Sequence, residues 1–360
     1  MNTQIETILQ KAEAASASDI HLASGEPVAI RVDGEISFPS EFGTTTQEDV
    51  LSIIQALLTP ETFQNLKQRK EYDFSYSHDE WHRYRCNVFY RKGALSLSMR
   101  RIKKKLLTLA EIGVPEQLTE LLQKNQGLIL ISGPAGSGKS TTMAAMLDWI
   151  NSNRKGHIVT IEDPIEYYFE NKNCLISQRE IDSDTNSFGD SLRAVMRQDP
   201  NIIIVGEIRD NETMETVLKL CSTGHLVIST IHTSSSSQTL HRILSLFPHE
   251  RHKMILSQLS DTLLAIVNQR LVPTIDSELV AIFELMLANT AIKNAVRGGD
   301  IMQIENTILT SSKEGMLTFK RHIDQLVLQG RLDRTNMVVP FVNTAKLEKL
   351  EGNFLKIISY

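Results

Sequence analysis

The fold is decided by the eight residues Gly133-Pro134-Ala135-Gly136-Ser137-Gly138-Lys139-Ser140, which match the pattern G-x-x-x-x-G-K-[ST] at every fixed position. They follow the apolar run Leu128–Ile131 and precede a helix-like segment that begins at Thr141. In a loop of this kind, backbone N–H groups surround phosphate oxygens, and the start of the helix adds partial positive charge. We therefore expect residues 133–141 to bind a nucleotide, with Lys139 on its outer phosphates and Ser140 holding Mg²⁺.

Short apolar runs alternate with helix-like segments throughout the region that contains this loop. The strand-like runs are Leu128–Ile131, His157–Ile161, Ile202–Val205 and Leu226–Thr230, and the helix-like segments are Thr141–Asn151, Ser187–Arg197 and Thr213–Cys221. Such alternation predicts an α/β domain with a largely parallel sheet and helices on both faces. Beyond Leu240 we expect mainly helix, with Met254–Val267 and Gly315–Leu328 as the clearest periodic segments.

The first 102 residues have a different, strand-rich pattern. The pair Asp33-Gly34 suits the positive φ angles of a tight turn and predicts a β-hairpin. Gln47–Lys70 has a helical pattern, and Tyr72–Ile102 alternates as strands do. These patterns predict an α+β domain, followed by a basic linker with a connecting helix and then by the α/β domain with its C-terminal helices. The expected bounds are 1–102, 103–126 and 127–360.

Composition excludes several classes of protein. The 360 residues carry 38 Lys and Arg against 43 Asp and Glu, and this acidic balance disfavours a surface built to bind nucleic acid. Cys86, Cys174 and Cys221 include no C-x-x-C pair, so we expect neither zinc nor a disulfide framework. The apolar runs are far shorter than the roughly 20 residues of a membrane-spanning helix. With no signal-peptide pattern at the N-terminus, the sequence predicts a cytoplasmic protein whose membrane contact is at most peripheral.

Acidic residues follow two of the predicted strands. Glu162-Asp163-Pro164-Ile165-Glu166 comes after the first, and Gly206-Glu207-Ile208-Arg209-Asp210 after the second. Open α/β sheets bind ligands at the carboxyl ends of their strands, so one of these carboxylates is a candidate to orient an attacking water. Gly206 stands where many phosphate-loop enzymes have a metal-associated aspartate. Glu207 must then act alone or together with Glu162, Asp163 or Glu166.

Two histidines bracket the fourth predicted strand. His225 and His232 are seven residues apart, which along an extended strand of about 3.3 Å per residue separates them by roughly 23 Å. They are therefore poor candidates for a shared metal ion. His232 has the better functional case, because it lies at the strand's outgoing end, near the expected outer phosphate.

Together with Ser18-Asp19-Ile20-His21-Leu22, the phosphate loop, 160–166, 206–210 and 223–233 resemble the motifs of the secretion ATPase superfamily. The order and spacing are most similar to its PilT-type branch, the type IV pilus retraction ATPases. This resemblance implies a PAS-like N-terminal domain, a RecA-like ATPase domain and a homohexameric ring that hydrolyses ATP with Mg²⁺. It also implies a partner, the inner-membrane platform protein of the pilus, and hence a peripheral position at that membrane.

The resemblance also implies roles for individual residues. Glu166 matches the residue that polarises the catalytic water, and Glu207 matches a glutamate expected to coordinate Mg²⁺. His225 and His232 match a motif that senses the phosphate state. Some arginines of the family reach nucleotide across domain or subunit boundaries, where a planar guanidinium suits phosphate oxygens. Their counterparts here are Arg85, Arg100, Arg193 and Arg197.

Within the superfamily, the absence of a four-cysteine motif and of a further N-terminal domain favours the retraction branch over pilus assembly and type II secretion ATPases. Retraction enzymes carry a segment reading Ala-Ile-Arg-Asn-Leu-Ile-Arg-Glu, which Ala291–Gly298 matches at four of eight positions. Lys293 and Gly298 depart from it. The sequence therefore leaves open a main retraction motor, a PilU-like accessory ATPase and the motor of a divergent pilus system.

The sequence is also compatible with two other functional classes. A nucleic-acid-translocating RecA-like ATPase would share the same core, although the net charge of -5 and the lack of a recognisable nucleic-acid-binding module count against it. A nucleotide-binding scaffold without hydrolysis would fit Gly206 at the aspartate position. Glu166 and Glu207 favour hydrolysis over this second alternative.

Overall fold

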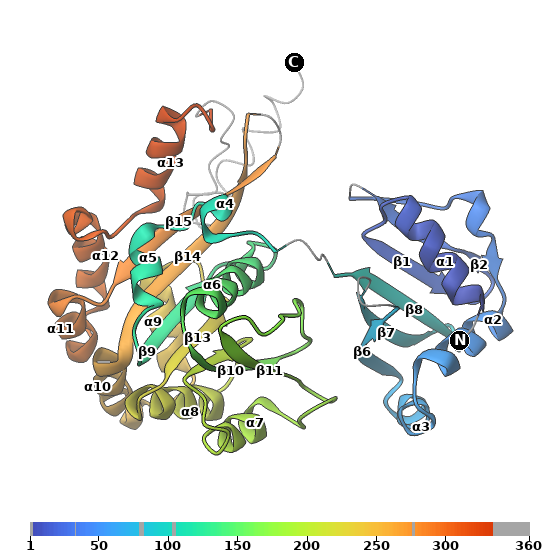
Figure 1. Ribbon diagram of the computed structural model, residues 1–360, viewed down its shortest axis with the longest axis horizontal. Helices are drawn as coiled ribbons and strands as arrows, with labels where there is room; N and C mark the ends of the chain where they lie inside the picture. Colours follow the sequence, from blue (N-terminus) through green and yellow to red (C-terminus); the bar gives the residue numbers. More distant parts are fainter. Residues whose placement is uncertain (1–2, 33, 79–82, 103–105, 276–277, 334–360) are drawn as a thin grey trace.

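The computed structural model describes residues 3–32, 34–78, 83–102, 106–275 and 278–333 (Figure 1). The N-terminal part holds a six-stranded antiparallel sheet in the order β4-β3-β1-β8-β7-β6. Its elements are α1 (Thr3–Ala14), β1 (Asp19–Ala23), β2 (Glu26–Pro27), β3 (Ala29–Val32), β4 (Glu35–Ser37), the 3₁₀ turn η1 (Ser40–Phe42), β5 (Thr44–Thr45), α2 (Gln47–Leu57), α3 (Pro60–Arg69), β6 (Glu71–Ser77), β7 (Arg83–Arg91) and β8 (Ala94–Arg101).

Local signals explain how this N-terminal sheet forms. Strands β3 and β4 pair with Val32 opposite Glu35, as a two-residue hairpin turn requires, and Gly34 adopts a φ of 87°; Asp33 lies outside the described residues. The single helical stretch expected from Gln47 is instead two helices. The break occurs because the Thr59 side chain caps a new helix at Pro60, a residue favoured in a first turn.

The second part is built on a seven-stranded sheet in the order β11-β10-β12-β13-β9-β14-β15. Neighbouring strands run parallel except β15, which is antiparallel to β14. Its strands are β9 (Gly127–Ser132), β10 (Gly156–Glu162), β11 (Cys174–Glu180), β12 (Ile202–Val205), β13 (Leu226–Ile231), β14 (Leu263–Pro273) and β15 (Leu279–Leu287). Its helices are α4 (Leu109–Ile112), α5 (Glu116–Leu121), α6 (Lys139–Asn153), α7 (Phe188–Val195), α8 (Asn211–Ser222), α9 (Ser236–Ser245), α10 (His252–Thr262), α11 (Thr290–Gly298), α12 (Ile301–Thr310) and α13 (Phe319–Leu328), with 3₁₀ turns η2 (His249–Arg251) and η3 (Ser312–Glu314).

Alternate side chains of the central strands enter two cores, one on each face of this sheet. In β9, Leu128 and Leu130 pack with α7, α8, α9 and α10, whereas Ile129 and Ile131 pack with α4, α5 and α6. The predicted α/β fold, with a mostly parallel sheet and helices on both faces, is thereby confirmed.

The helix predicted over Met254–Val267 is wrong in its second half. Helix α10 ends at Thr262, and the chain continues directly into β14, which forms an antiparallel pair with β15. From Ala265 to Val267 every residue is buried, because β14 lies inside the sheet with a core on either side. Such a run has no period of two, so pattern alone does not separate it from helix. Between β15 and residue 333, where the described residues end, the chain is mainly helical, as expected, although α13 starts at Phe319 rather than Gly315.

The segment between the two sheets belongs largely to the second core. Leu109, Ile112, Leu118 and Leu122 are buried there beside α6. The three lysines 103–105 of the expected basic linker lie outside the described residues. Among the described residues, no helix combines the length and apolar character needed to cross a bilayer.

Candidate active site

A cavity of about 600 Å³ opens at the carboxyl ends of β9, β10, β12 and β13. Many of the predicted site residues line it, and they come from separate loops. The residues considered from the sequence that line it are Arg85, Ala135, Gly136, Ser137, Gly138, Lys139, Ser140, Thr141, Glu162, Asp163, Glu166, Glu207 and His232. Gly133 and Pro134 belong to the same loop without lining the cavity.

Strand β14 packs directly against the phosphate loop. Gly133 adopts a φ of 152°, and a side chain there would collide with the Gln269 carbonyl oxygen. The Gln269 side chain accepts a hydrogen bond from Thr142 Oγ1 at 2.7 Å, which ties the first turn of α6 to the same strand. Glycine at position 133 is therefore required by the close approach of β14 as well as by the turn.

Lys139 lies at the mouth of the loop and is buried. Its Nζ donates to the carbonyl oxygens of Gly133 and Pro134, both at 2.9 Å. Burial lowers the pKa of Lys139, an effect that the carboxylates of Glu207 and Glu166 oppose. Nearby, Ser137 Oγ is buried with no hydrogen-bond partner among the described residues. These polar groups suit phosphate oxygens, which would satisfy the hydroxyl and offer the ammonium anionic acceptors.

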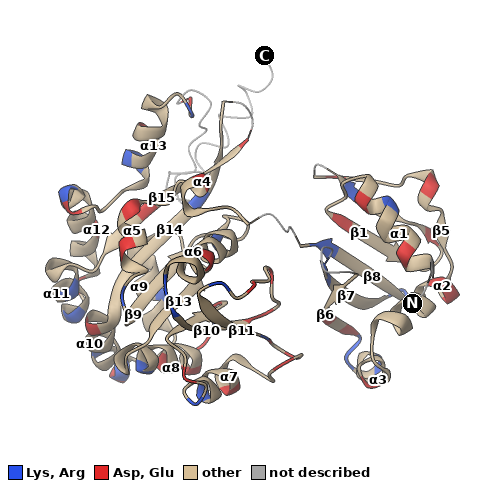
Figure 2. Cartoon of the chain, viewed as in Figure 1, with Lys and Arg blue, Asp and Glu red and all other residues tan. Residues whose placement is uncertain are grey.

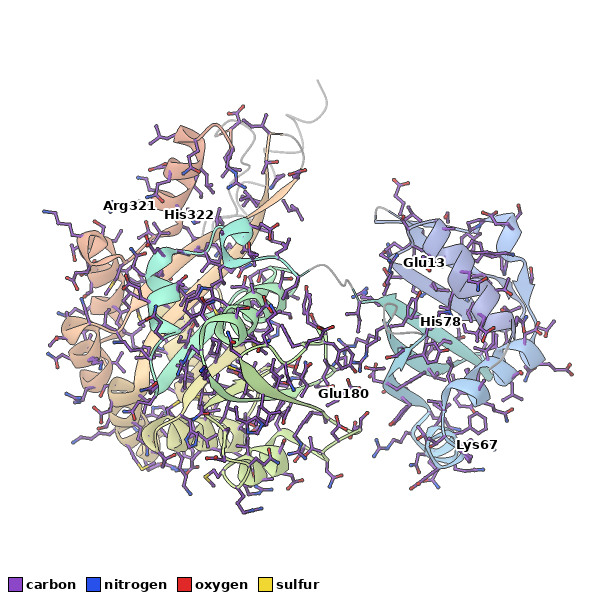
Figure 3. All side chains as sticks on the ribbon, in the orientation of Figure 1. Glu13, Lys67, His78, Glu180, Arg321 and His322 are labelled. Carbon is purple, nitrogen blue, oxygen red and sulfur yellow. The ribbon has the colours of Figure 1, made fainter. Side chains whose placement is uncertain are left out.

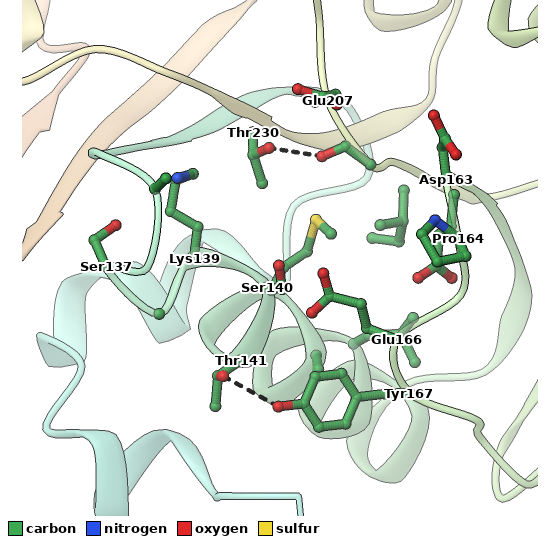
Figure 4. Close-up of a pocket in the computed structure, with 18 of the residues that line it drawn as sticks. Ser137, Lys139, Ser140, Thr141, Asp163, Pro164, Glu166, Tyr167, Glu207 and Thr230 are labelled. Atoms are coloured by element: carbon green, nitrogen blue, oxygen red, sulfur yellow. Dashed lines mark hydrogen bonds between the residues drawn. The ribbon is translucent and has the colours of Figure 1, made fainter. Parts of the chain in front are cut away.

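Two carboxylates face Lys139 and Ser140 from different strand ends (Figure 4). Glu166 projects from the loop after β10, and Glu207 from the loop after β12. Glu207 is mostly buried; its Oε1 pairs with the Arg209 guanidinium, and its Oε2 lies 3.5 Å from His232 Nε2. The arrangement can hold an anionic group on Lys139 and, next to it, a cation or a water molecule on the carboxylates.

Glu162 is a third acid that lines the cavity, at the last position of β10. Burial raises its pKa to about 7, although hydrogen bonds from Thr160 Oγ1 at 2.6 Å and Gln178 Nε2 at 3.2 Å favour the carboxylate. Glu162 is therefore expected to gain or lose its proton near neutral pH, whereas an ordinary glutamate is ionised there.

The two histidines occupy opposite ends of β13. His232 lies beside Lys139, whereas the Nδ1–H of His225 donates to the Leu220 carbonyl oxygen at 3.0 Å, at the end of α8. The structure therefore does not bring His225 into the cavity of its own chain. The physical reason is the extended six-residue strand between them, which also keeps them from sharing a metal ion.

Of the four predicted arginines, only Arg85 lines the cavity. Arg100 pairs with Asp19 at 2.7 Å within the N-terminal sheet. Arg193 pairs with Asp190 at 2.6 Å and with Glu212, and Arg197 is exposed at the end of α7. These three side chains do not reach the cavity of their own chain.

Arg209 and Tyr167 are among the lining residues to which the sequence assigned no role. Arg209 pairs with Glu207 and lies 3.7 Å from Asp163, so it bridges two acidic loops. Tyr167 meets Thr141 through a hydroxyl–hydroxyl hydrogen bond of 3.1 Å (Figure 4). Arg209 could have been found from its place two residues after Glu207; Tyr167 carries no such signal, because its contact depends on how the loop folds back onto α6.

The oxygen donors suit a divalent cation that is shared with phosphates. Among the described residues, no three His, Cys, Asp or Glu side chains are grouped to enclose a metal ion. Mg²⁺ needs no such cage, because it binds through one or two protein oxygens, substrate phosphates and water. Ser140 and Glu207 could supply those protein oxygens.

A strand–loop–helix phosphate site, with carboxylates at the ends of neighbouring parallel strands, defines a P-loop nucleotide hydrolase. The family model described as type II/IV secretion system protein matches residues 1–303. The type IV pilus retraction ATPase PilT of Pseudomonas aeruginosa is 38% identical over 89% of this chain and 93% of its own length. The ATPase PilU of the same organism is 33% identical over 91% and 86%.

A crystal structure of the pilus retraction motor PilT with bound ADP superimposes with a TM-score of 0.86 at 38% identity. The match covers 95% of this chain and 98% of that one. The chain belongs to the PilT family of type II/IV secretion system proteins, and its site is that of an ATPase.

Proposed function

We propose that this chain is one subunit of a homohexameric ATP-hydrolysing motor that powers type IV pilus retraction. The observation that supports the proposal best is the convergence of Lys139, Glu166 and Glu207 on one cavity (Figure 4). The relatives named as retraction and twitching motility proteins supply the biological process.

In this proposal ATP phosphates lie on residues 133–141. Lys139 leaves its two loop carbonyls and binds the outer phosphates, while Glu166 orients the attacking water. Ser140 and Glu207 hold Mg²⁺, which when bound neutralises charge that develops on the phosphate oxygens. His232 lies beside Lys139 and is placed to sense whether the outer phosphate is present.

The PAS-like domain at 1–102 and the RecA-like domain at 127–360 then move against each other as nucleotide is bound and released. Such a stroke requires contacts that exist only before hydrolysis, and Arg85 is placed to make one of them from the N-terminal side. We propose that His225, Arg100, Arg193 and Arg197, which do not face their own chain's cavity, act at boundaries between subunits. The ring would work in the cytoplasm, peripherally at the inner membrane, on the pilus platform protein.

The test is phosphate release by the full-length protein across a concentration series, with mass photometry on the same samples. We expect specific activity to rise as hexamers form, and Glu207→Gln and Glu166→Gln to be at least about 100-fold slower. Equal activity of wild type and both variants would contradict the site assignment. A rise in turnover caused by DNA would favour a nucleic-acid translocase instead.

A PilU-like accessory role is the second candidate. The observation that favours it is the departure of Lys293 and Gly298 from the retraction-motor segment, together with the similarity to PilU. Expression in a strain that lacks its main retraction motor decides between the two roles. Restored twitching supports the motor, and restoration only when an inactive main motor is also present supports the accessory role.

A further inference from the structure

One side chain of the N-terminal sheet grips the loop that carries Glu166. Arg83, the first residue of β7, donates from Nη2 to Glu180 Oε2 at 2.7 Å, and both side chains are mostly buried. Glu180 ends β11, on the side of the second sheet that faces the N-terminal part (Figure 3). The ion pair therefore joins two structural units with separate hydrophobic cores.

Glu180 links Arg83 to the loop that carries Glu166. The same Oε2 atom that accepts from Arg83 also accepts the backbone N–H of Ile165 at 3.0 Å. Ile165 is itself buried and immediately precedes Glu166. Loss of the arginine would leave this carboxylate as a buried charge without its cation, so its hold on Ile165 would weaken or shift.

Arg83 also touches the loop on the other side of Glu166. Its guanidinium carbon lies 4.1 Å from the centre of the Tyr168 ring, within cation–π range. The neighbouring Tyr167 is held to Thr141 on the phosphate-loop helix. One arginine thus contacts the loop directly at residue 168 and indirectly at 165.

Charge around this contact is complementary. Figure 2 shows basic segments where β8 ends and acidic segments along the loops next to β11. Burial lowers the pKa of Arg83, and the carboxylates of Glu180 and Glu162 counter that effect, so the guanidinium stays charged. Arg83 Nε and Nη1 are buried without a partner among the described residues, which leaves Glu180 as the hydrogen-bonding anchor.

We propose that Arg83 is a positioning residue for ATP hydrolysis, through which docking of the N-terminal sheet sets the place of Glu166. It does not line the cavity, so it acts through Glu180 and Tyr168 and not on the nucleotide. This inference rests on the proposed role of Glu166. Hydrolysis is then fast only while the two parts of the chain are in contact.

The test compares the full-length Arg83→Met and Arg83→Lys proteins with Arg91→Met as matched control. Arg91 ends the same strand β7 and pairs with Glu26 at 2.7 Å on the exposed surface of the N-terminal part. We expect Arg83→Met to lower kcat at least about 10-fold, because small displacements of a catalytic group are costly. Arg83→Lys should recover part of the loss, and Arg91→Met should match wild type. ADP affinity of the Arg83 variants should stay near the wild-type value, and kcat is measured well below the melting temperature of each variant, because an unpaired buried Glu180 lowers the stability of Arg83→Met.

A double-mutant cycle that combines Arg83→Met with Glu180→Gln tests whether Arg83 acts through Glu180. If the two residues act as one unit, Arg83→Met combined with Glu180→Gln is no slower than Arg83→Met alone, within about twofold. Unchanged kcat in Arg83→Met, additive losses, or a loss of ADP affinity in place of kcat would each overturn the proposal. The Glu166→Gln protein tests the role of Glu166 separately from that of Arg83. If it remains active, the assigned role of Glu166 fails, whatever the Arg83 variants do.

Discussion

The Nζ atom of Lys139 lies 3.5 Å from Nδ1 of His232. An ammonium can only donate, so Nδ1 must be the acceptor and the imidazole proton must be on Nε2, toward Glu207. Burial and the nearby lysine both lower the pKa of His232, which keeps the ring neutral. An outer phosphate that draws Lys139 away would therefore also change the surroundings of this histidine.

We predict that His232→Ala lowers kcat at least about 10-fold while ADP affinity changes less than about threefold. The reason is that the imidazole lies beside Lys139 and Glu207, at the end of the cavity where the outer phosphate is expected. Steady-state kinetics and fluorescent-ADP titration measure the two quantities. His225→Ala is the control for ADP affinity, and an equal loss of kcat in that variant would indicate that a neighbouring subunit completes the site.

We predict that the free energy of unfolding depends on pH through the carboxyl group of Glu162. Its pKa is about 7 in the folded protein against an ordinary value of 4.5, so between these values the folded state binds more protons. Folding is therefore weakened as pH rises through this range, and the full cost is present above pH 7.

The variant Glu162→Gln removes this cost and keeps an oxygen that can accept from Thr160 and Gln178. We expect its melting temperature to exceed that of wild type by roughly 2–6 °C at pH 8.5, with little difference at pH 5. Differential scanning fluorimetry across this pH range provides the measurement. A gain that is the same at both pH values would show that the carboxyl is not the cause.

Arg209 is predicted to compete with a divalent cation for Glu207. Removing it in Arg209→Gln should strengthen Mn²⁺ binding in the presence of ADP by roughly threefold, the effect of a partly exposed ion pair. Electron paramagnetic resonance of Mn²⁺ measures this directly. Arg251→Gln, which breaks a surface pair with Glu215, serves as control. Weaker Mn²⁺ binding in Arg209→Gln would place the arginine on the nucleotide phosphates instead.

Gly298, at the end of α11, is predicted to be replaceable. It is exposed, its φ is not in the left-handed region, and a Cβ there would meet no atom within 4 Å. Gly298→Ala should therefore stabilise the protein by about 0.5–1 kcal/mol in chemical denaturation, because alanine restricts the unfolded chain. The same change at Gly299, whose φ is 74°, should destabilise it. If both substitutions had the same sign, this account of the helix end would be wrong.

The parallel sheet could be predicted because strands β9, β10, β12 and β13 are short apolar runs separated by helical patterns and glycines. Strand β14 could not, because burial on both faces removed the alternation that distinguishes strand from helix. The phosphate loop could be predicted because it is a contiguous motif whose glycines are required by the backbone geometry of the loop. At His232 the position at a strand end was enough to suggest a role.

Contacts between distant segments were beyond reach of the sequence. Arg83 and Glu180 are 97 positions apart, and no motif connects them. The same holds for Gln269, whose contact with Thr142 depends on β14 lying next to β9. The sequence also could not show which arginines reach the cavity. Arg193 and Arg197 have the residue type and spacing of phosphate ligands, yet Arg193 is exposed on α7 and Arg197 is exposed just beyond its end.

The placement of β14 beside β9 also has a consequence for synthesis on the ribosome. The strand before the phosphate loop is complete at Ser132, yet one of its two neighbours begins only at Leu263. A nascent chain that has emerged as far as β13 therefore contains the whole loop while one edge of β9 is unpaired and Gln269 is missing. We expect nascent chains to acquire nucleotide binding late, after Pro273 has left the exit tunnel, and until then the open edge of β9 is a site for chaperones to protect.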